Sequence, residues 1–353
     1  MLGEAEIVWF DGKGPLDPPT LGGKCRNLVA LTRAGLPVPP GFAIPVETFF
    51  AFIDAAELRE KLDREMKSAA TSIDEVSAAR IMELFTRASM PAAFRRAILD
   101  GYSQLGARTG IAKSRVAVRS SATTEDLETA SAAGQQLTLL DISGDDTLIA
   151  AVLQCWASLF SYNALSYRMQ RGLHHGGDPP GMAVGVQALV QAQASGVMFT
   201  VDPISGDSSR IVVEAIGGLG EPLVGGEVTP DRYVVDKRSG RIVEQRIGDR
   251  AFELVCTGSG SVRRDVPVER RRLPCLTHHG LDRLLELSGH VEGALGSGQD
   301  IEWAFDESGR CLLLQARPIT VSGRPLPAPD ASTHATRPRS ALLGELYRRW
   351  PGS

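Results

Sequence analysis

The sequence predicts an α+β protein of two lobes, and three features of its pattern support this prediction. Apolar residues recur at helical spacing over residues 46–105 and again over about residues 147–171. From residue 183 the pattern changes to short apolar runs typical of strands, interrupted by one helical stretch at about 280–295. Because helices come first and strands follow, an α+β fold is favoured over a repeated βαβ sheet.

The first lobe is expected to span residues 1–180. Residues 5–10 predict a short strand, and Gly22 opens a helix that the prolines at 37, 39 and 40 end. Helices are predicted over 46–105, a strand at 115–119 and a Ser/Thr-rich loop from Ser120 to Thr124. Another strand is predicted at 137–142, followed by one long helix over about 147–171.

The second lobe is expected to span residues 181–322, after a Gly/Pro-rich break at 176–181. The strands predicted in it are 183–190, 196–200, 211–215, 232–237 and 311–315. Residues 323–353 are expected to form a linker and tail, because their first half is rich in Pro, Ser, Thr and Arg. Residues 341–350 have the spacing of a short amphipathic helix, which is either a frayed terminus or a docking segment for a partner.

Composition excludes several classes of protein. The 353 residues carry a net charge of −4, with 43% hydrophobic and 23% charged residues. The sequence has no basic excess, so composition does not point to nucleic acid or an anionic membrane as partner. No apolar run reaches the length of a membrane span, which is about 18 residues. Five scattered cysteines without a CxxC pair predict neither a disulfide framework nor a zinc site. The N-terminus lacks an apolar signal segment, so a cytoplasmic location is expected.

Phosphoryl transfer from a nucleotide needs cations over the phosphates and oxygen ligands for magnesium. The sequence has neither a GxxxxGK[ST] loop nor protein-kinase motifs, so any such site is dispersed. Gly22-Gly23-Lys24 offers close backbone approach and a point charge, although such a turn is also commonplace before a helix. Arg119 ends a strand beside a hydroxyl-rich run that is suited to phosphate, although a capped surface turn fits equally well.

Four polar residues near the end of the second lobe form the strongest local pattern. Asp300 and Glu302 alternate along one predicted strand, and Gln315 and Arg317 alternate along the next. Because alternate residues share a strand face, pairing through a turn at 306–310 would align all four. Oxygen ligands beside an arginine suit a magnesium-bound polyphosphate. The alternative is a solvated hairpin face with an ordinary ion pair.

A Gly-rich turn, Gly217 to Gly220, follows a strand and is a weaker candidate for a nucleotide-facing loop. Glu214 and Glu221 flank it and are candidate ribose or metal contacts. The histidine pairs at 174–175 and 278–279 lack metal-binding spacing, so we interpret them as surface or packing residues.

Several segments together resemble the nucleotide-binding domain of the phosphoenolpyruvate synthase, pyruvate phosphate dikinase and rifampin phosphotransferase family. The matching segments lie in the family's order between residues 21 and 320 and include LGGKCRNLVAL, VAVRSSATTEDLETASAAGQQ, ASGVMFTVDPISG, GGLGEPLVGGEVTPDRYVVDK and QDIEWAFDESGRCLLLQARPIT. The resemblance implies an ATP-grasp-like fold in which two lobes clasp ATP and Mg²⁺.

The resemblance also implies residue roles. Glu302 and Gln315 would coordinate magnesium, and Lys24, Arg119 and Arg317 would act on the phosphates during catalysis. The implied ATP-binding residues are Lys24, Arg119, Gln187, Leu189, Thr200, Glu214, Glu221, Asp300 and Arg317. Gln187 to Val190 would pass the adenine, whereas Thr200, Glu214 and Glu221 would line the phosphate or ribose side.

Enzymes of this family carry the transferred group on a histidine of a mobile domain, and nothing in this sequence resembles that carrier motif or an acceptor domain. The resemblance therefore predicts a nucleotide-activating half that phosphorylates a carrier-histidine protein in trans. Two alternatives remain open. One is a non-catalytic ATP-binding regulatory or scaffold module, and the other is a stand-alone kinase of a small molecule.

Overall fold

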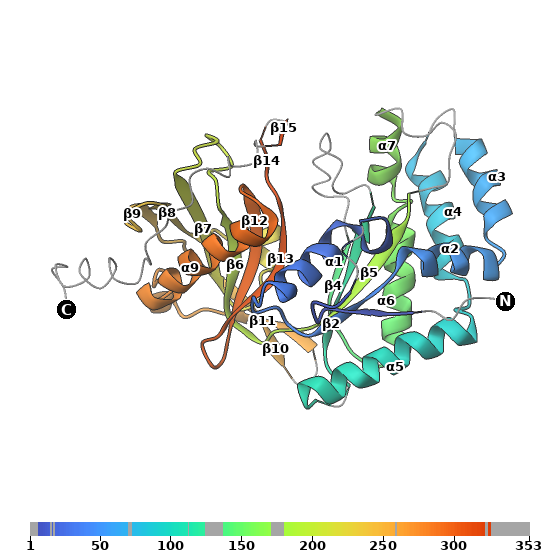
Figure 1. Cartoon of the computed structure of the whole chain (residues 1–353), viewed down its shortest axis with the longest axis horizontal. Helices are drawn as coiled ribbons and strands as arrows, with labels where there is room; N and C mark the ends of the chain where they lie inside the picture. Colours follow the sequence, from blue (N-terminus) through green and yellow to red (C-terminus); the bar gives the residue numbers. More distant parts are fainter. Residues whose placement is uncertain are drawn as a thin grey trace.

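The structure is a computed structural model that describes residues 6–14, 16, 18–69, 73–111, 113–123, 137–170, 180–257, 260–321 and 324–325. Two antiparallel sheets, one of five strands and one of six, lie side by side in the described part of the chain (Figure 1). Helices surround the first sheet, and the long helix α9 (His278–Leu295) covers one face of the second (Figure 1). The predicted α+β class and the two-lobed arrangement are therefore confirmed.

The sheet of the first lobe has the strand order β1-β2-β5-β3-β4. Its strands are β1 (Val8–Trp9), β2 (Gly41–Ile44), β3 (Val116–Ala122), β4 (Thr138–Ile142) and β5 (Met182–Ala188). The helices of this lobe are α2 (Val46–Ala55), α3 (Arg59–Ala69), α4 (Glu75–Thr86), α5 (Ala92–Thr109), α6 (Asp145–Ser158) and α7 (Tyr162–Gln170). Aromatic side chains from α2, α4 and α6 fill the core, where the rings of Phe52 and Trp156 lie 4.8 Å apart.

The sheet of the second lobe has the order β13-β12-β6-β7-β8-β9. Its strands are β6 (Ala192–Phe199), β7 (Arg210–Gly217), β8 (Asp231–Asp236), β9 (Ile242–Arg246), β12 (Gln299–Asp306) and β13 (Cys311–Pro318). Helix α9 (His278–Leu295) packs on one face, where Leu284 and Leu287 meet Ile301 and Trp303 in a buried core. The opposite face of this sheet carries the polar residues of the candidate functional site.

Several smaller elements follow or interrupt the second sheet. The antiparallel hairpin β10 (Phe252–Thr257) and β11 (Gly260–Asp265) follows β9, and a 3-10 turn η1 (Val268–Arg270) leads on to α9. Helix α8 (Glu221–Val224) follows the Gly-rich turn after β7. Strands β14 (Thr320–Val321) and β15 (Arg324–Pro325) pair after β13. The predicted helix at 341–350, and with it the question of a frayed or docking tail, lies outside the described residues.

Helix α1 (Pro18–Arg33) joins the two lobes. Leu28 packs in a cluster with the first lobe, whereas Leu31 belongs to the core of the second. The side-chain amide of Asn27 also donates a hydrogen bond of 2.8 Å to the carbonyl of Ala316 in β13. The helix is thus a shared element that fixes how the two sheets face each other.

The chain crosses from the first sheet to the second at residues 189–191, because β5 pairs between β2 and β3 and not with β6. The boundary expected at residue 180 precedes this strand. A division at residues 189–191, with α1 contributing to both lobes, is the one that strand pairing supports, and the domain limits themselves stay a prediction.

Three local expectations need correction. Ser120 to Ala122 continue strand β3 and do not form a loop, because they pair with Met182 to Val184 of β5; Thr123 is a turn, and Thr124 lies outside the described residues. The single helix expected at 147–171 is two helices, interrupted at residues 159–161. The sequence pattern does not predict strand β9 or the β10–β11 hairpin. Charged residues on the outer faces of these strands hide the alternation of apolar and polar residues.

One helical stretch of the described residues, Asp145–Gln170, is long and apolar enough by composition to cross a membrane. However, 72% of its most apolar window is buried inside the molecule, where Trp156 and its neighbours form the first core. Core packing therefore accounts for its apolar character.

Gly22 interrupts α1 with a backbone conformation of φ 64° and ψ 171°, which is open almost only to glycine. A β-carbon here would lie 2.2 Å from the carbonyl oxygen of Ser121, so the close approach is to strand β3. We expect Gly22→Ala to lower the free energy of unfolding by about 3 kcal/mol. Gly35→Ala is the matched control, because Gly35 has φ 75° but a β-carbon there would meet no atom within 4 Å.

The control should cost only the backbone strain, about 1 kcal/mol. Urea unfolding of both variants measures the two values. Equal losses in the two variants would contradict the role of the contact with Ser121.

Candidate functional site

A cavity of about 410 Å³ lies between the two lobes. Strands β3, β4 and β5 line it from the first lobe, and β6, α8, β12 and β13 line it from the second. The sequence-predicted residues in its lining are Arg119, Gln187, Leu189, Glu221 and Glu302. The structure thus brings together side chains that are far apart in sequence, at the place where the two lobes meet.

Arg119 crosses from one lobe to the other. It lies in β3, only 8% of it is exposed, and one terminal nitrogen donates to Glu302 Oε2 at 2.8 Å. The same nitrogen donates to Gln315 Oε1 at 3.2 Å. Its Nε is buried without a hydrogen-bond partner among the described residues. A buried donor of this kind costs free energy unless a ligand satisfies it, which favours a site for an anion here.

Strand register explains why Glu302 and Gln315 lie together. The two residues are direct cross-strand neighbours on β12 and β13, and Asp300 faces Arg317 in the same way. The turn after β12 is closed by Asp306, whose carboxylate accepts from the backbone amides of Ser308 and Arg310. The hairpin predicted from residues 300–317 is therefore confirmed, with its four polar side chains on one face.

Further cross-strand neighbours extend from Glu302 across the sheet, away from β13. Val197, Glu214 and Arg232 follow it as successive neighbours on β6, β7 and β8. Glu214 and Arg232 form an ion pair of 3.0 Å. Glu214 therefore shares the sheet face with the site but does not line the cavity, so its predicted nucleotide contact stays a prediction.

Lys24 is buried in the segment of α1 after the kink, with only 5% exposed. Its ammonium donates to the carbonyl oxygen of Ser120 at 3.1 Å, next to Arg119. Ser121 fixes this segment from the strand side, because its hydroxyl donates to Leu21 O and accepts from the amide of Cys25. The kink at Gly22 is thus what holds Lys24 beside β3.

Gln187 lies near the end of β5 and Leu189 follows the strand directly, and both residues line the cavity. Only 2% of Gln187 is exposed, and its Nε2 has no hydrogen-bond partner among the described residues. The amide of Leu189 donates to the carbonyl of Arg115, which keeps this segment extended. The surroundings suit a nucleobase, with apolar walls and an unsatisfied buried donor.

Thr200 and Glu221 have different environments. Thr200 is fully buried, and its hydroxyl accepts from the amide of Gln299 at 2.9 Å, so it joins β6 to β12 and does not line the cavity. Glu221 is exposed at the start of α8 and lines the cavity. Their predicted contacts with a nucleotide remain predictions.

The cavity also contains residues that sequence reasoning did not assign. Leu140 on β4, Ser195 on β6, Leu219 in the Gly-rich turn and Trp303 on β12 all line it. The indole nitrogen of Trp303 is buried without a partner in the described part of the chain. Trp303 follows Glu302 directly, so its side chain belongs to the other face of β12, in the core under α9, and the strand period of Glu302 gives no signal for it. The bulge opposite these two residues lies on β13, where Leu314 is the extra residue and also lines the cavity.

The electrostatics of the two neighbouring carboxylates differ. Burial would raise the pKa of Glu302, but Arg119, Lys24 and Arg317 together hold it below its usual range. Burial raises the pKa of Asp300, against the attraction of Arg317, whose guanidinium lies 2.8 Å away. Glu302 is therefore the carboxylate that stays ionised most readily.

The donor set fits a magnesium ion. Oxygens of Glu302 and Gln315 converge on one nitrogen of Arg119, so they already point at a shared cationic centre. Carboxylate and amide oxygens are ligands that Mg²⁺ prefers, and it usually takes only one or two of them beside substrate phosphates. In the described part of the chain no group of three or more His, Cys, Asp and Glu side chains could hold a metal ion.

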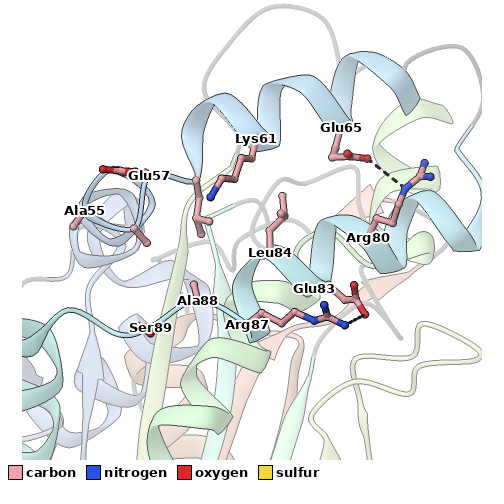
Figure 2. Close-up of a pocket in the computed structure, with 12 residues that line it drawn as sticks. Ala55, Glu57, Lys61, Glu65, Arg80, Glu83, Leu84, Arg87, Ala88 and Ser89 are labelled. Atoms are coloured by element: carbon pink, nitrogen blue, oxygen red, sulfur yellow. Dashed lines mark hydrogen bonds and ion pairs between the residues drawn. The ribbon is translucent and has the colours of Figure 1, made fainter.

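A larger groove of about 590 Å³ lies on helices α2, α3 and α4 of the first lobe (Figure 2). Arg80 and Glu65 pair across it at 3.4 Å, and Arg87 pairs with Glu83 at 3.1 Å (Figure 2). Its charged side chains therefore largely neutralise one another, and no sequence-predicted site residue lines it. The interlobe cavity is the candidate site, because five of the predicted residues line it and the unsatisfied donors of Arg119, Gln187 and Trp303 belong to its lining residues.

The opposite pKa shifts give a pH prediction. The raised pKa of Asp300 means that the folded state binds its proton more tightly, so the ionised group destabilises the fold at neutral pH. We expect Asp300→Asn to be more stable than the original chain at pH 7. This difference should vanish as the pH falls through the raised pKa towards the ordinary value of 3.8.

Glu302→Gln should behave in the opposite way. The lowered pKa of Glu302 contributes stability above the ordinary value of 4.5, and this is lost as the pH falls through the folded value. This variant should therefore be less stable at pH 7 and equal to the original chain in acid. Unfolding free energies from pH 3 to 8 test both signs, and a common sign for the two variants would contradict this assignment of the two carboxylates.

Comparisons with known proteins identify the family of this chain. A family model described as pyruvate phosphate dikinase, AMP/ATP-binding domain, matches residues 18–337. The phosphoenolpyruvate synthase of Aeropyrum pernix is 39% identical, over 90% of this chain and 43% of that protein. The probable phosphoenolpyruvate synthase of Archaeoglobus fulgidus is 39% identical, over 89% of this chain and 41% of its own length. The chain thus spans less than half the length of these relatives.

Among solved structures, the D-cycloserine synthetase DcsG is similar with a TM-score of 0.31 and 12% identity, over 85% of this chain and 63% of that one. A likeness at this level carries no argument about the fold. The family match covers most of the chain, includes every element that builds the cavity, and agrees with the resemblance seen in the sequence. This chain belongs to the pyruvate phosphate dikinase AMP/ATP-binding domain family.

Proposed function

We propose that this chain binds MgATP in the interlobe cavity and transfers a phosphoryl or pyrophosphoryl group from ATP to a carrier histidine on a separate domain or protein. The transferred group would go on to pyruvate, giving phosphoenolpyruvate, or to another small molecule. The observation that carries the proposal is the convergence of Arg119, Glu302 and Gln315 across the two lobes, beside the cavity.

The arrangement suits the charge changes of phosphoryl transfer. A histidine nitrogen attacks phosphorus, the bond from that phosphorus to the bridging oxygen breaks, and the nucleotide leaves with the electron pair. Negative charge then develops on the leaving phosphate and must be neutralised. Lys24 and Arg119 supply fixed cations from the first lobe, and Arg317 supplies one from the second. Burial strengthens the effect of Lys24 and Arg119, because little water competes with them.

Oxygens of Glu302 and Gln315 would hold Mg²⁺, which would neutralise phosphate charge when bound. To receive it, Arg119 would have to move from its present contacts with these two oxygens to the phosphates, a shift that its unsatisfied Nε also favours. The nucleobase would occupy the end of the cavity near Gln187 and Leu189, with Glu221 towards the ribose.

The experiment that tests the proposal mixes the chain with MgATP and a carrier-histidine domain from a phosphoenolpyruvate synthase. We expect AMP and acid-labile phosphohistidine to form together, and only when both proteins are present. ATP binding without any transfer would favour a non-catalytic ATP-binding module instead. Turnover by the isolated chain on a small molecule would favour a stand-alone kinase. The proposal includes a cytoplasmic location for the chain.

A further inference from the structure

The β10–β11 hairpin is an excursion of the second lobe that reaches the first lobe next to the cavity. Ser261 on β11 donates a hydrogen bond of 2.7 Å to Asp141 Oδ2, and Asp141 lies on β4, the edge strand of the first sheet. Only 9% of the Asp141 side chain is exposed, and its other oxygen pairs with Arg115. This bond joins the two lobes at a point separate from the contacts of Arg119.

The backbone at Asp141 is shaped for this contact. Asp141 has φ 62°, a left-handed conformation that is costly for a residue other than glycine. It lies in a bulge where β4 departs from regular pairing with β3, and bulges of this kind re-aim side chains next to sites. Leu140, its neighbour in the bulge, lines the cavity. A shift at Asp141 is therefore transmitted to the cavity wall.

The hairpin also supports the opposite wall. The amide of Leu219 donates to the carbonyl of Leu254 on β10 at 2.8 Å, and Leu219 lines the cavity. A β-carbon on Gly218, where φ is 75°, would lie 2.3 Å from the same carbonyl. The Gly-rich turn needs a glycine here because of the hairpin behind it.

The base of the hairpin is firmly held by the second lobe. Asp231 on β8 is fully buried and pairs with Arg250, of which 6% is exposed, just before β10. The other carboxylate oxygen of Asp231 accepts a hydrogen bond from the backbone amide of Cys275, which lies between η1 and α9 after the hairpin. Because the base of the hairpin is fixed, a contact at its far end constrains the second lobe. A hairpin with a loose base would move without affecting that lobe.

We infer that the Ser261–Asp141 hydrogen bond is an interlobe latch that holds the cavity walls around the nucleotide, with Ser261 and Asp141 as positioning residues. The inference rests on the proposed function, since the cavity is taken as the MgATP site. The latch acts through Leu140 on one wall and Leu219 on the other, and neither latch residue lines the cavity itself.

The test compares Ser261→Ala, which removes the hydroxyl, with Ser261→Thr, which keeps it. We expect the alanine variant to bind MgATP about tenfold more weakly, the scale of one hydrogen bond to a charged group, and threonine to restore most of the affinity. Ser308→Ala is the matched control, because it removes a Ser–Asp bond of 2.6 Å within one turn of the same lobe. A double-mutant cycle with Asp141→Asn should show that the two losses are not additive.

Hydrogen exchange without nucleotide separates this inference from the proposed function. Amides of β4 and of residues 252–257 and 260–265 should exchange faster in Ser261→Ala than in Ser308→Ala. Unchanged exchange, additive losses or equal affinities of the two alanine variants would each overturn the latch. If the original chain does not bind MgATP at all, the proposed function fails, and the exchange result alone decides whether the lobes are latched.

Discussion

Arg119→Met is expected to abolish phosphoryl transfer and also to lower the unfolding temperature, because it leaves the carboxylate of Glu302 without its guanidinium. Arg119 reaches from β3 to both Glu302 and Gln315, so removing its side chain takes a fixed positive charge away from the developing phosphate charge. Losses of about 10³-fold in turnover are typical when such an arginine is removed. The measurement is AMP formation with a carrier-histidine domain, alongside the unfolding temperature.

Arg119→Lys should recover only part of the activity. Lysine keeps the charge but lacks the other guanidinium nitrogens, among them the buried Nε that has no partner among the described residues and could bind a phosphate oxygen. Arg95→Met is the matched control, because Arg95 pairs with Asp146 at 2.7 Å on the exposed surface of the same lobe. Equal activity of Arg119→Met and the control would remove Arg119 from the site.

Glu302→Ala is expected to weaken the response to magnesium by about 100-fold, as changes at or next to metal ligands commonly do. It should also destabilise the protein, because it leaves the buried guanidinium of Arg119 without its carboxylate. Glu302→Gln keeps an oxygen for Arg119 and should lose less stability, while still losing the anionic ligand. Titration of ATP turnover with Mg²⁺ measures the first effect, and thermal unfolding measures the second.

Glu244→Gln is the control for this pair of variants. Glu244 lies on β9 of the same sheet, and it pairs with Arg246 at 3.0 Å in an exposed position. Its loss should leave both the magnesium response and the unfolding temperature nearly unchanged. A magnesium response in Glu302→Ala equal to that of the control would mean that Glu302 is not a ligand.

Strand period is the most informative feature of the sequence. Alternation at 300–302 and 315–317, together with a turn at 306–310, is enough to predict the hairpin and the shared face of its polar residues. It cannot predict the bulge at Leu314 on β13, a residue that lines the cavity, because a bulge leaves the local composition unchanged. Register and irregularity are set by partner strands that lie far away in sequence.

Polar composition is misleading elsewhere. Ser120 and Ser121 look like a loop in sequence, yet they are fully buried in β3 because their hydroxyls bond to neighbouring backbone. The glycines at 22 and 218 suggest ligand-facing backbone in sequence, whereas each avoids a collision with a protein carbonyl. A glycine signals close approach, but the sequence does not say to what.

The most direct test of the central claim is a crystal structure of this chain with Mg²⁺ and a non-hydrolysable ATP analogue. We predict that the analogue lies in the cavity between the two sheets, with its base near Gln187 and its phosphates near Arg119. We also predict a metal ion within reach of Glu302 and Gln315. A nucleotide bound in the groove of α2, α3 and α4, or elsewhere with the cavity empty, would contradict the claim.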